Sequence, residues 1–383
     1  MIAAGQGNNG GAASRIVMHI DLDYFYAQCE EARNPSLGGK PLVVCVYSGR
    51  TEDSGVVSTA NYVARKYGVK SGIPIKLAKS RLADTADSVL LPMDMPYYSK
   101  VSENVMSVIQ QFAEKFEQVG IDECFVDVTS NVGSFDEARS LALQIKESIR
   151  QNAQLSCSIG VGPNKMIAKI ASDFQKPDGL TVVDSTSAKE FVAGLAVDRI
   201  PGIGPKTTLQ LAELGISKVG ELVKIDQFKL VEEFGRGTAT FLYNAARAVD
   251  EEPVVVAANA GERKQIARIV TLKNDASSST EMSDELYQLC RAVLDAARNR
   301  DVSFKTISIL LILTNLNQKT KSRSLKTHSN DFDVLHSTAR ALLDDLMAAT
   351  ISATDRKVRR LGVRLSEFHD NSGQNTMSQF IGD

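Results

Sequence analysis

Two short acidic clusters constrain this chain most, because each follows an apolar run of the kind that forms a buried strand. Asp21 follows Ile16–Ile20, and the pair Asp122 and Glu123 lies roughly a hundred residues later, in the string GIDECFVDV. A buried strand would deliver such carboxylates at its end. Three carboxylates suit Mg²⁺, and two such ions can hold the attacking and leaving oxygens of a phosphoryl displacement. The clusters therefore predict nucleotidyl transfer.

The alternative is that these acidic residues belong to ordinary turns and bind no metal. An aspartate after a strand often caps the next helix, and an Asp-Glu pair beside a turn is often only solvated. The metal-site interpretation needs both carboxylates on one side, whereas neighbouring residues of a regular strand point to opposite faces. Asp122 and Glu123 converge only at a hairpin turn or bulge, and Gly120 just before them permits such a turn.

The charge distribution indicates a basic C-terminal module on an acidic body. The chain has 383 residues and a net charge of −2, and its length allows about two to four domains. From Lys264 to Phe368 there are 17 lysine and arginine residues against 12 acidic residues. Such an excess suits contact with a phosphate backbone, although an ordinary solvated basic face is the alternative.

Other features of the composition predict a cytoplasmic protein. No apolar run approaches the length of a membrane span, and the N-terminus lacks a signal-peptide pattern. The cysteines are scattered without a CxxC pair, which predicts reduced, mostly buried thiols and no zinc site. Residues 1–14 are rich in Gly, Ala and Asn, so we expect a disordered extension or a tag.

Residues 15–180 alternate strand-like and helix-like segments, which predicts a layered fold of helices and sheet. The expected strands are Ile16–Ile20, Val43–Val46, Cys124–Val128 and Ser156–Val161. The expected helices are a stretch ending at Arg33, Met95–Phe116, Phe135–Asn152 and one from Asn164 to about Phe174.

Residues 185–247 are largely helical and contain two glycine turns. One turn contains Gly202 and Gly204, and the other contains Gly235 and Gly237. Glycine alone would explain a helix cap and a turn. Two copies in series favour helix-hairpin-helix motifs, whose backbone N–H groups hold a DNA phosphate without reading sequence. The acidic stretch that follows, with its proline, is best interpreted as a linker.

The basic module has the order βαββαβ, which suits a four-stranded sheet with two helices on one face. The last strand is expected at Lys357–Phe368. Arg360 and Arg364 share one face of it by the period of two, whereas Arg359 points the other way. We expect Arg360 and Arg364 to contact template phosphates. The preceding segments are Ile266–Leu272, Met282–Arg300, Phe304–Leu313, Lys321–Lys326 and Phe332–Met347.

Five strings in register resemble Y-family translesion DNA polymerases of the DinB class, particularly archaeal members. The strings are IDLDYFYAQCEE, GKPLVVCVYSGRTEDSGVVSTANYVARKYGVKSGIPI, GIDECFVDV, SIGVGPNKMIAKIASDFQKPDG and IPGIGPKTTLQLAELGI. The resemblance runs from Ile16 to Phe368 and implies an α+β, multidomain, right-hand polymerase. It implies a palm (15–34 and 92–180), fingers (35–91), a helical thumb (181–249), a linker (250–263), a little finger (264–368) and a tail (369–383).

The resemblance also implies roles for individual residues. Asp21, Asp122 and Glu123, with the backbone carbonyl of Leu22, would hold two Mg²⁺ ions. The triphosphate contacts would be Thr59, Tyr62, Arg65 and Lys176, and Lys165 would contact a DNA phosphate. Tyr26 falls at the position where a bulky ring excludes a ribose 2′-OH. Asp23 is not implied as a ligand, and supporting the strand-to-helix turn is its expected role.

The implied activity is template-directed DNA synthesis of low fidelity, past damaged bases and without a proofreading exonuclease. The tail residues Gln374, Met377, Phe380 and Ile381 resemble a peptide that docks on a sliding clamp, although Ile381 stands where an aromatic residue is usual. The family suggests a monomer. A nucleotide cyclase and a non-catalytic DNA-binding scaffold are the alternatives, and primer extension separates them from a polymerase.

Overall fold

The computed structural model describes residues 15–255, 264–351 and 357–370. The chain divides into two compact units: Met1–Val46 with Val56–Ala260, and Tyr47–Gly55 with Gly261–Asp383. The predicted extension at residues 1–14, most of the predicted linker and nearly all of the predicted tail lie outside the described residues.

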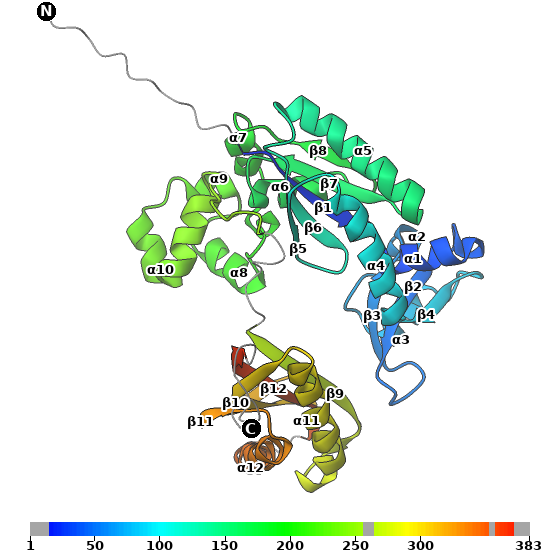
Figure 1. The fold of residues 1–383 in the computed structure, drawn as a ribbon, viewed down its shortest axis with the longest axis vertical. Helices are drawn as coiled ribbons and strands as arrows, with labels where there is room; N and C mark the ends of the chain where they lie inside the picture. The colour runs from blue at the N-terminus through cyan, green and yellow to red at the C-terminus, as the bar shows by residue number, and fades with distance from the viewer. Residues whose placement is uncertain (1–14, 256–263, 352–356, 371–383) are drawn as a thin grey trace, which may run out of the picture. The chain divides into compact units, whose positions relative to one another are not determined.

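The first unit is built on a five-stranded sheet of order β5-β6-β1-β7-β8 (Figure 1). The central strand β1 runs antiparallel to both β6 and β7, and β7 is parallel to β8. Apolar and β-branched residues dominate β1, β6 and β7, as expected for strands with both faces covered. The bounds are β1 Val17–Leu22, β5 Lys115–Gln118, β6 Glu123–Asp127, β7 Cys157–Gly162 and β8 Leu180–Val182.

The two faces of the sheet differ in what covers them. Met18, Ile20 and Leu22 of β1 belong to one buried core with helices α4 (Met95–Gln110) and α5 (Phe135–Ala153). By the alternation of a strand, Val17, His19 and Asp21 point to the other face. There Val17 packs with Phe125 and with Ala168 of helix α6 (Lys165–Phe174). The acidic side chains therefore project from the face that α6 covers.

A smaller three-stranded sheet of order β3-β2-β4 forms the region expected to be fingers. Strand β2 (Leu42–Tyr47) pairs in parallel with β4 (Val89–Pro92), and β3 (Gly55–Ala60) lies on its other side. Of these three strands, the sequence predicted only β2. The helices and 3-10 turn of this part are α1 Phe25–Arg33, η1 Pro35–Leu37, α2 Tyr62–Arg65 and α3 Ile75–Arg81.

One predicted helix was too long. The pattern predicted a helix over Met95–Phe116, but α4 ends at Gln110 and β5 begins at Lys115. Strand β5 pairs with β6, for example Phe116 with Val126, and Phe116 is buried in the sheet core. Pairing with a distant strand thus overrides the local helical pattern.

The helical region that follows contains both glycine turns. Gly202 has φ 96° and precedes α8 (Pro205–Glu213), as expected for a turn into a helix. Gly235 has φ 73° and interrupts α10 (Gln227–Ala245), so this segment is two helices joined at a kink. The remaining elements are α7 Ala188–Ala193, η2 Val197–Arg199 and α9 Val219–Leu222.

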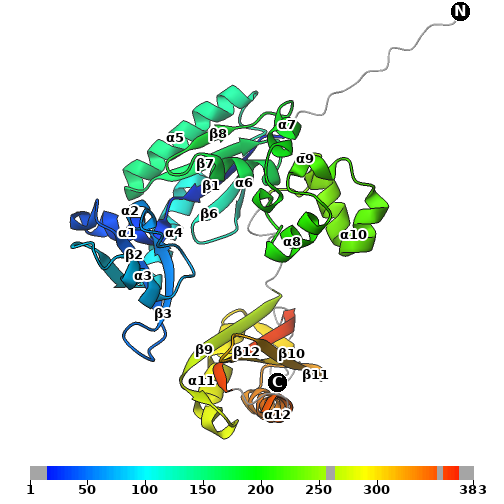
Figure 2. The same ribbon diagram turned by 180° about the vertical axis from the view of Figure 1, so that it is seen from behind.

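The second unit contains a four-stranded antiparallel sheet of order β11-β10-β12-β9, shown from both sides in Figures 1 and 2. Helices α11 and α12 pack against each other and share one core with the sheet. The predicted βαββαβ order is confirmed. The bounds are β9 Gln265–Ala276, η4 Thr280–Met282, α11 Ser283–Arg298, β10 Val302–Leu313, β11 Gln318–Ser329, α12 Phe332–Ile351 and β12 Val358–Asp370.

The remaining composition-based predictions concern thiols and membranes. All the cysteines are buried as thiols outside disulfides, as predicted: Cys29, Cys45, Cys124, Cys157 and Cys290. Among the described residues, no helix combines the length and the apolar character needed to cross a membrane.

Candidate active site

The pairing of β1 with β6 brings the two acidic clusters together. Asp21 lies directly opposite Glu123 in the register, so both side chains project from the same face of the sheet. Asp122 precedes the strand, in the turn between β5 and β6, and its carbonyl accepts a hydrogen bond of 2.8 Å from the Leu22 N–H. The sequence analysis required a hairpin turn or bulge for Asp122 and Glu123 to converge, and the structure has a hairpin turn at this place.

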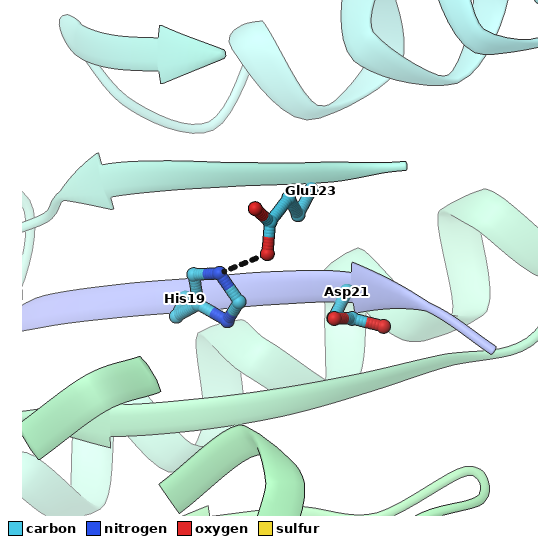
Figure 3. A group of neighbouring side chains, drawn as sticks. All are labelled: His19, Asp21 and Glu123. Atoms are coloured by element: carbon cyan, nitrogen blue, oxygen red, sulfur yellow. Dashed lines mark hydrogen bonds and ion pairs between the residues drawn. The ribbon is translucent and has the colours of Figure 1, made fainter. Parts of the chain in front are cut away.

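Three side chains of this face could share a metal ion. Ligand atoms of His19, Asp21 and Glu123 lie within 4.8 Å of one another, and Figure 3 shows them side by side across the two strands. Asp122 lies outside this group, but its charge acts on Asp21, and the charge of Glu123 acts on Asp122. Two partly buried carboxylates in such proximity, with a third beside them, fit a hard divalent cation.

Two lysines neutralise the carboxylates. The Lys176 ammonium lies 2.8 Å from Asp21, and the Lys169 ammonium donates to Glu123 Oε2. The pKa of Glu123 is lowered to about 2, by the hydrogen bond from His19 and then, against burial, by Lys169. Burial raises the pKa of Asp21 although Lys176 opposes it, and burial also raises the pKa of Asp122. Glu123 is therefore the carboxylate most firmly held in its charged form.

Asp23 has the structural role that the sequence suggested. Its side chain is buried and accepts hydrogen bonds from the hydroxyls of Ser156 and Ser158 and from the Asp178 N–H, at 2.8–2.9 Å. The carboxylate thus ties the end of β1 to β7 and to the loop before β8.

Glycine at position 120 gives Glu123 its space. A Cβ atom on Gly120 would stand 2.9 Å from Glu123 Cγ and 3.3 Å from Asp122 Oδ1. Any other residue here would force the Glu123 side chain to shift, so the conformation of Glu123 depends on this glycine.

The residues predicted to bind a triphosphate surround the same corner of the sheet. Tyr62 and Arg65 lie on α2, with the Arg65 guanidinium 4.7 Å from the centre of the Tyr62 ring. Asp21 and Lys176 both act on the Tyr62 hydroxyl electrostatically. Thr59 is buried on β3, just before α2. A guanidinium, an ammonium and a phenol hydroxyl together suit a polyphosphate.

Tyr26 lies on α1 beside the carboxylates. Its ring stacks on that of Tyr98 with the centroids 4.8 Å apart, and the side chain is half-buried. Burial raises the pKa of its hydroxyl, and the charge of Asp122 adds to this effect. The ring is thus fixed in place next to the predicted metal ligands.

Comparisons with known proteins agree with this geometry. Residues 20–173 match the impB/mucB/samB family, residues 198–250 match the DNA polymerase-iota thumb domain, and residues 263–378 match the C-terminal domain of the impB/mucB/samB family. The chain is 44% identical to DNA polymerase IV of Nitrosopumilus maritimus, over 96% of this chain and 100% of that protein. It is 38% identical to DNA polymerase IV of Saccharolobus solfataricus, over 94% of this chain and 98% of that protein.

The chain belongs to the Y family of DNA-directed DNA polymerases. Among solved structures, a Y-family DNA polymerase chimera matches with a TM-score of 0.84 and 35% identity, over 93% of this chain and all of that chain. The insertion ternary complex of Dbh DNA polymerase matches with a TM-score of 0.64 and the same identity and coverage. The predicted palm, helical thumb and C-terminal little finger of a Y-family polymerase are thereby confirmed.

One residue predicted to contact DNA, Lys165, is paired with carboxylates of the protein itself. Lys165 is buried, and its ammonium lies 2.9 Å from Glu117 and 3.0 Å from Glu252. Glu117 also accepts a hydrogen bond from the Val255 N–H, and Val254 is buried against the sheet. Lys165 therefore ties the start of the linker to the palm, and contact with a DNA phosphate, which stays a prediction, would require its ammonium to leave these carboxylates. The sequence gives no sign of this, because both partners are distant in the chain.

The two arginines of the last strand share a face, as predicted. Arg360 lies opposite Thr271 of β9 and Arg364 opposite Ser308 of β10. Arg360 Nε donates to the Thr271 hydroxyl at 2.9 Å, and Arg364 reaches the Ser308 hydroxyl at 3.4 Å. The alternate residues Leu361, Val363 and Leu365 lie in the core that the sheet shares with the helices, so the arginines point away from that core. The predicted clamp-binding residues Gln374, Met377, Phe380 and Ile381 lie outside the described residues.

Sequence reasoning missed three residues around Glu123: His19, Lys169 and Ser172. His19 stands two positions before Asp21, so the alternation of a strand places both side chains on one face. Lys165, Lys169 and Ser172 follow the spacing of a single helix face. The alternation of the strand and the spacing of the helix could therefore have shown that these residues share a face of their own element. The sequence does not show which strand α6 packs against.

Proposed function

We propose that this Y-family polymerase adds deoxynucleotides to a primer 3′-OH opposite a template, including damaged template bases, with two Mg²⁺ ions at the carboxylate cluster. One observation carries the proposal. Asp21 lies opposite Glu123 across β1 and β6, Asp122 lies in the adjoining turn, and Lys176 is paired with Asp21. This arrangement combines oxygen ligands for divalent ions with a cation for a polyphosphate.

The carboxylates and the residues around them would have different roles. Asp21, Asp122 and Glu123 would hold the ions, together with the backbone carbonyl of Leu22. Bound Mg²⁺ would lower the pKa of the primer hydroxyl and neutralise the leaving pyrophosphate. Lys176 would transfer its ion pair from Asp21 to the triphosphate, which Arg65, Tyr62 and Thr59 also contact in the proposal: Arg65 as a bidentate donor, Tyr62 and Thr59 as neutral ones.

Selection of the nucleotide rests on Tyr26 and on the small residues of the fingers. The Tyr26 ring, fixed against Tyr98, would occupy the space that a ribose 2′-OH needs. Small residues such as Gly72 and Ser71 would form an open pocket above the nascent base pair. Loose selection by shape accounts for low fidelity and for synthesis past damaged bases.

The protein would hold the primer-template through contacts to the DNA phosphate backbone, which do not depend on base sequence. The turns with Gly202 and Gly204 and with Gly235 and Gly237 would present backbone N–H groups to phosphates. Arg360 and Arg364 would contact template phosphates from the little finger. We further propose a monomer that is tethered to a sliding clamp through its tail, a contact that rests on the sequence pattern alone and would raise the effective concentration at the primer.

Primer extension tests the proposal. The assay uses Mg²⁺ with an undamaged template and with a template that carries an abasic site. Glu123→Ala is the site variant, and Glu103→Ala on the exposed face of α4 is the matched control. We expect the unmodified protein and the control to extend past the lesion and Glu123→Ala to fail on both templates.

Two results would contradict the proposal. Binding of the duplex without extension by the unmodified protein would favour a non-catalytic scaffold. Undiminished extension by Glu123→Ala would remove the carboxylate cluster as the metal site.

A further inference from the structure

The ring of Tyr26 rests on a buried tyrosine that is itself held by a carboxylate. Tyr26 and Tyr98 stack with their centroids 4.8 Å apart and their planes 27° from parallel. Tyr98 is fully buried, whereas Tyr26 is only half-buried. The Tyr98 hydroxyl donates a hydrogen bond of 2.7 Å to Glu30 Oε1. Tyr26 and Glu30 are four residues apart on α1, so they share one face of that helix and meet Tyr98 of α4 there.

Glu30 is held in turn by Arg33, which lies three residues further along α1. The side chain of Glu30 is 3% exposed, and Arg33 Nη2 lies 2.7 Å from its Oε1 and 2.6 Å from its Oε2. Arg33 Nη1 also donates to Asp94 Oδ2 at 3.0 Å. A buried carboxylate that is paired with a guanidinium is a fixed and strong acceptor for a hydroxyl. The position of Tyr98 is therefore set by this carboxylate as well as by apolar packing.

This support matters because selection by steric clash requires a ring that does not retreat. A ribose 2′-OH would press on the Tyr26 ring, and a small shift of a mobile side chain would relieve the clash. A ring backed by a close-packed side chain resists such a shift. If Tyr26 moves toward Tyr98, then Tyr98 has to strain its hydrogen bond to Glu30. The free energy of that displacement limits how strongly the protein discriminates between the two sugars.

We propose that Glu30 is a positioning residue for sugar selection: through the Tyr98 hydroxyl it holds the Tyr26 ring where a ribose 2′-OH would lie. The inference rests on the role proposed above for Tyr26. It extends that role to a carboxylate whose hydrogen-bond partners, Arg33 and Tyr98, lie outside the predicted metal cluster.

The experiment measures single-nucleotide primer extension by the full chain, with a deoxynucleotide and with the matching ribonucleotide. The readout is the ratio of the two kcat/KM values, deoxynucleotide over ribonucleotide, on one preparation, so the fraction of folded protein cancels. Tyr98→Phe keeps the ring and removes the hydroxyl. Tyr97→Phe makes the same change at the neighbouring position, whose hydroxyl lies 3.4 Å from the Cys29 carbonyl. We expect Tyr98→Phe to lower the ratio by about tenfold, the effect of one hydrogen bond to a charged group, and Tyr97→Phe to leave it unchanged.

Variants of Glu30 test whether the carboxylate acts through that hydroxyl. Glu30→Met removes the acceptor at similar side-chain volume, whereas Glu30→Gln keeps an oxygen that can accept from Tyr98. We expect Glu30→Met to lower the ratio as Tyr98→Phe does, with recovery in Glu30→Gln. Because both residues act through one hydrogen bond, the double variant Glu30→Met with Tyr98→Phe should lose no more than either single variant.

Tyr26→Ala separates the two levels of inference. If Tyr26→Ala leaves the ratio unchanged, the proposed role of Tyr26 fails, and the inference about Glu30 fails with it. If Tyr26→Ala lowers the ratio but Tyr98→Phe matches the unmodified protein, Tyr26 selects the sugar and the role of Glu30 is wrong. Losses that add in the double variant, or equal losses in Glu30→Met and Glu30→Gln, would also overturn it, because the hydrogen bond would then not be the link.

Discussion

The packing of α6 on the central sheet makes a sharp prediction for Gly160. This residue lies on β7, opposite His19 of β1. A Cβ atom added to Gly160 would overlap the Ala168 carbonyl oxygen and the Ser172 backbone nitrogen, and would lie 2.8 Å from the Ala171 carbonyl carbon. All three atoms belong to the backbone of α6, so no side-chain rotation can relieve the overlap. The Gly160→Ala substitution must therefore push the helix away from the strand.

The cost follows from the size of the shift. Carbon–oxygen contacts are comfortable near 3.5 Å, so the helix has to move by roughly 1 Å or more. Overpacking of this kind costs about 1–3 kcal/mol, and rigid backbone on both sides places Gly160→Ala at the upper end of that range or above it. For a body of this size, each kcal/mol lowers Tm by roughly 2–4 °C. We expect Gly160→Ala to lose ~5 °C or more.

Thermal unfolding by circular dichroism measures this loss. Gly194→Ala is the matched control, since Gly194 has φ −74° and a Cβ there would meet no atom within 4 Å. The control should unfold like the unmodified protein or slightly above it. A loss in Gly160→Ala below about 0.5 kcal/mol, the scatter of ordinary surface substitutions, would refute the close packing of α6 on β7. The same shift carries Lys169 and Ser172 away from Glu123, so primer extension should fall with stability.

Three further predictions concern the nucleotide, the DNA and pH. Tyr26→Ala should retain DNA synthesis and incorporate ribonucleotides, while Tyr26→Phe should still exclude them; unchanged sugar discrimination in Tyr26→Ala, measured with single nucleotides, would refute the steric role. Arg360→Ala should weaken duplex binding on all sequences and reduce the slope of log K against log salt by about 0.9, whereas Arg291→Ala on α11 should leave it unchanged. Because burial lowers the pKa of His19 below its value of 6.5, the unfolded chain binds the proton more readily, so stability should fall as pH drops below about 6.5. His19→Phe should flatten that part of the pH profile in urea titrations.

Long periodic segments of the fold could be predicted from the sequence, and segments defined by distant pairing could not. The helices near Phe135–Ala153 and Ser283–Arg298 were predicted because their apolar residues recur along one face. Strands β5 and β8 were missed, because four and three residues are too short to show alternation. Lys115–Gln118 is a strand only because β6 lies beside it, which local sequence does not reveal.

The site residues show the same contrast between local patterns, which the sequence reveals, and distant pairing, which it does not. Asp21, Asp122 and Glu123 were found because they are charged residues beside apolar runs, a pattern visible in one dimension. The pairing of Lys165 with Glu117 and Glu252 was not predicted, because both carboxylates are distant in the sequence. A charged residue read from sequence carries no information about which distant carboxylate it meets.

The surroundings of Glu123 show how a fold can prepare a ligand before the metal arrives. Gly120 leaves room on one side of its side chain, and His19 and Lys169 occupy one carboxylate oxygen on the other. Donors on Oε2 lower the pKa of Glu123 to about 2, so the carboxylate is charged at neutral pH. Asp21 differs, since burial raises its pKa and Lys176 is the main group that counters this. If Lys176 leaves for a triphosphate, as proposed, Asp21 loses its cation at the moment when a divalent ion can replace it. Nucleotide and metal binding at Asp21 are then coupled, whereas Glu123 is ready for its metal in advance.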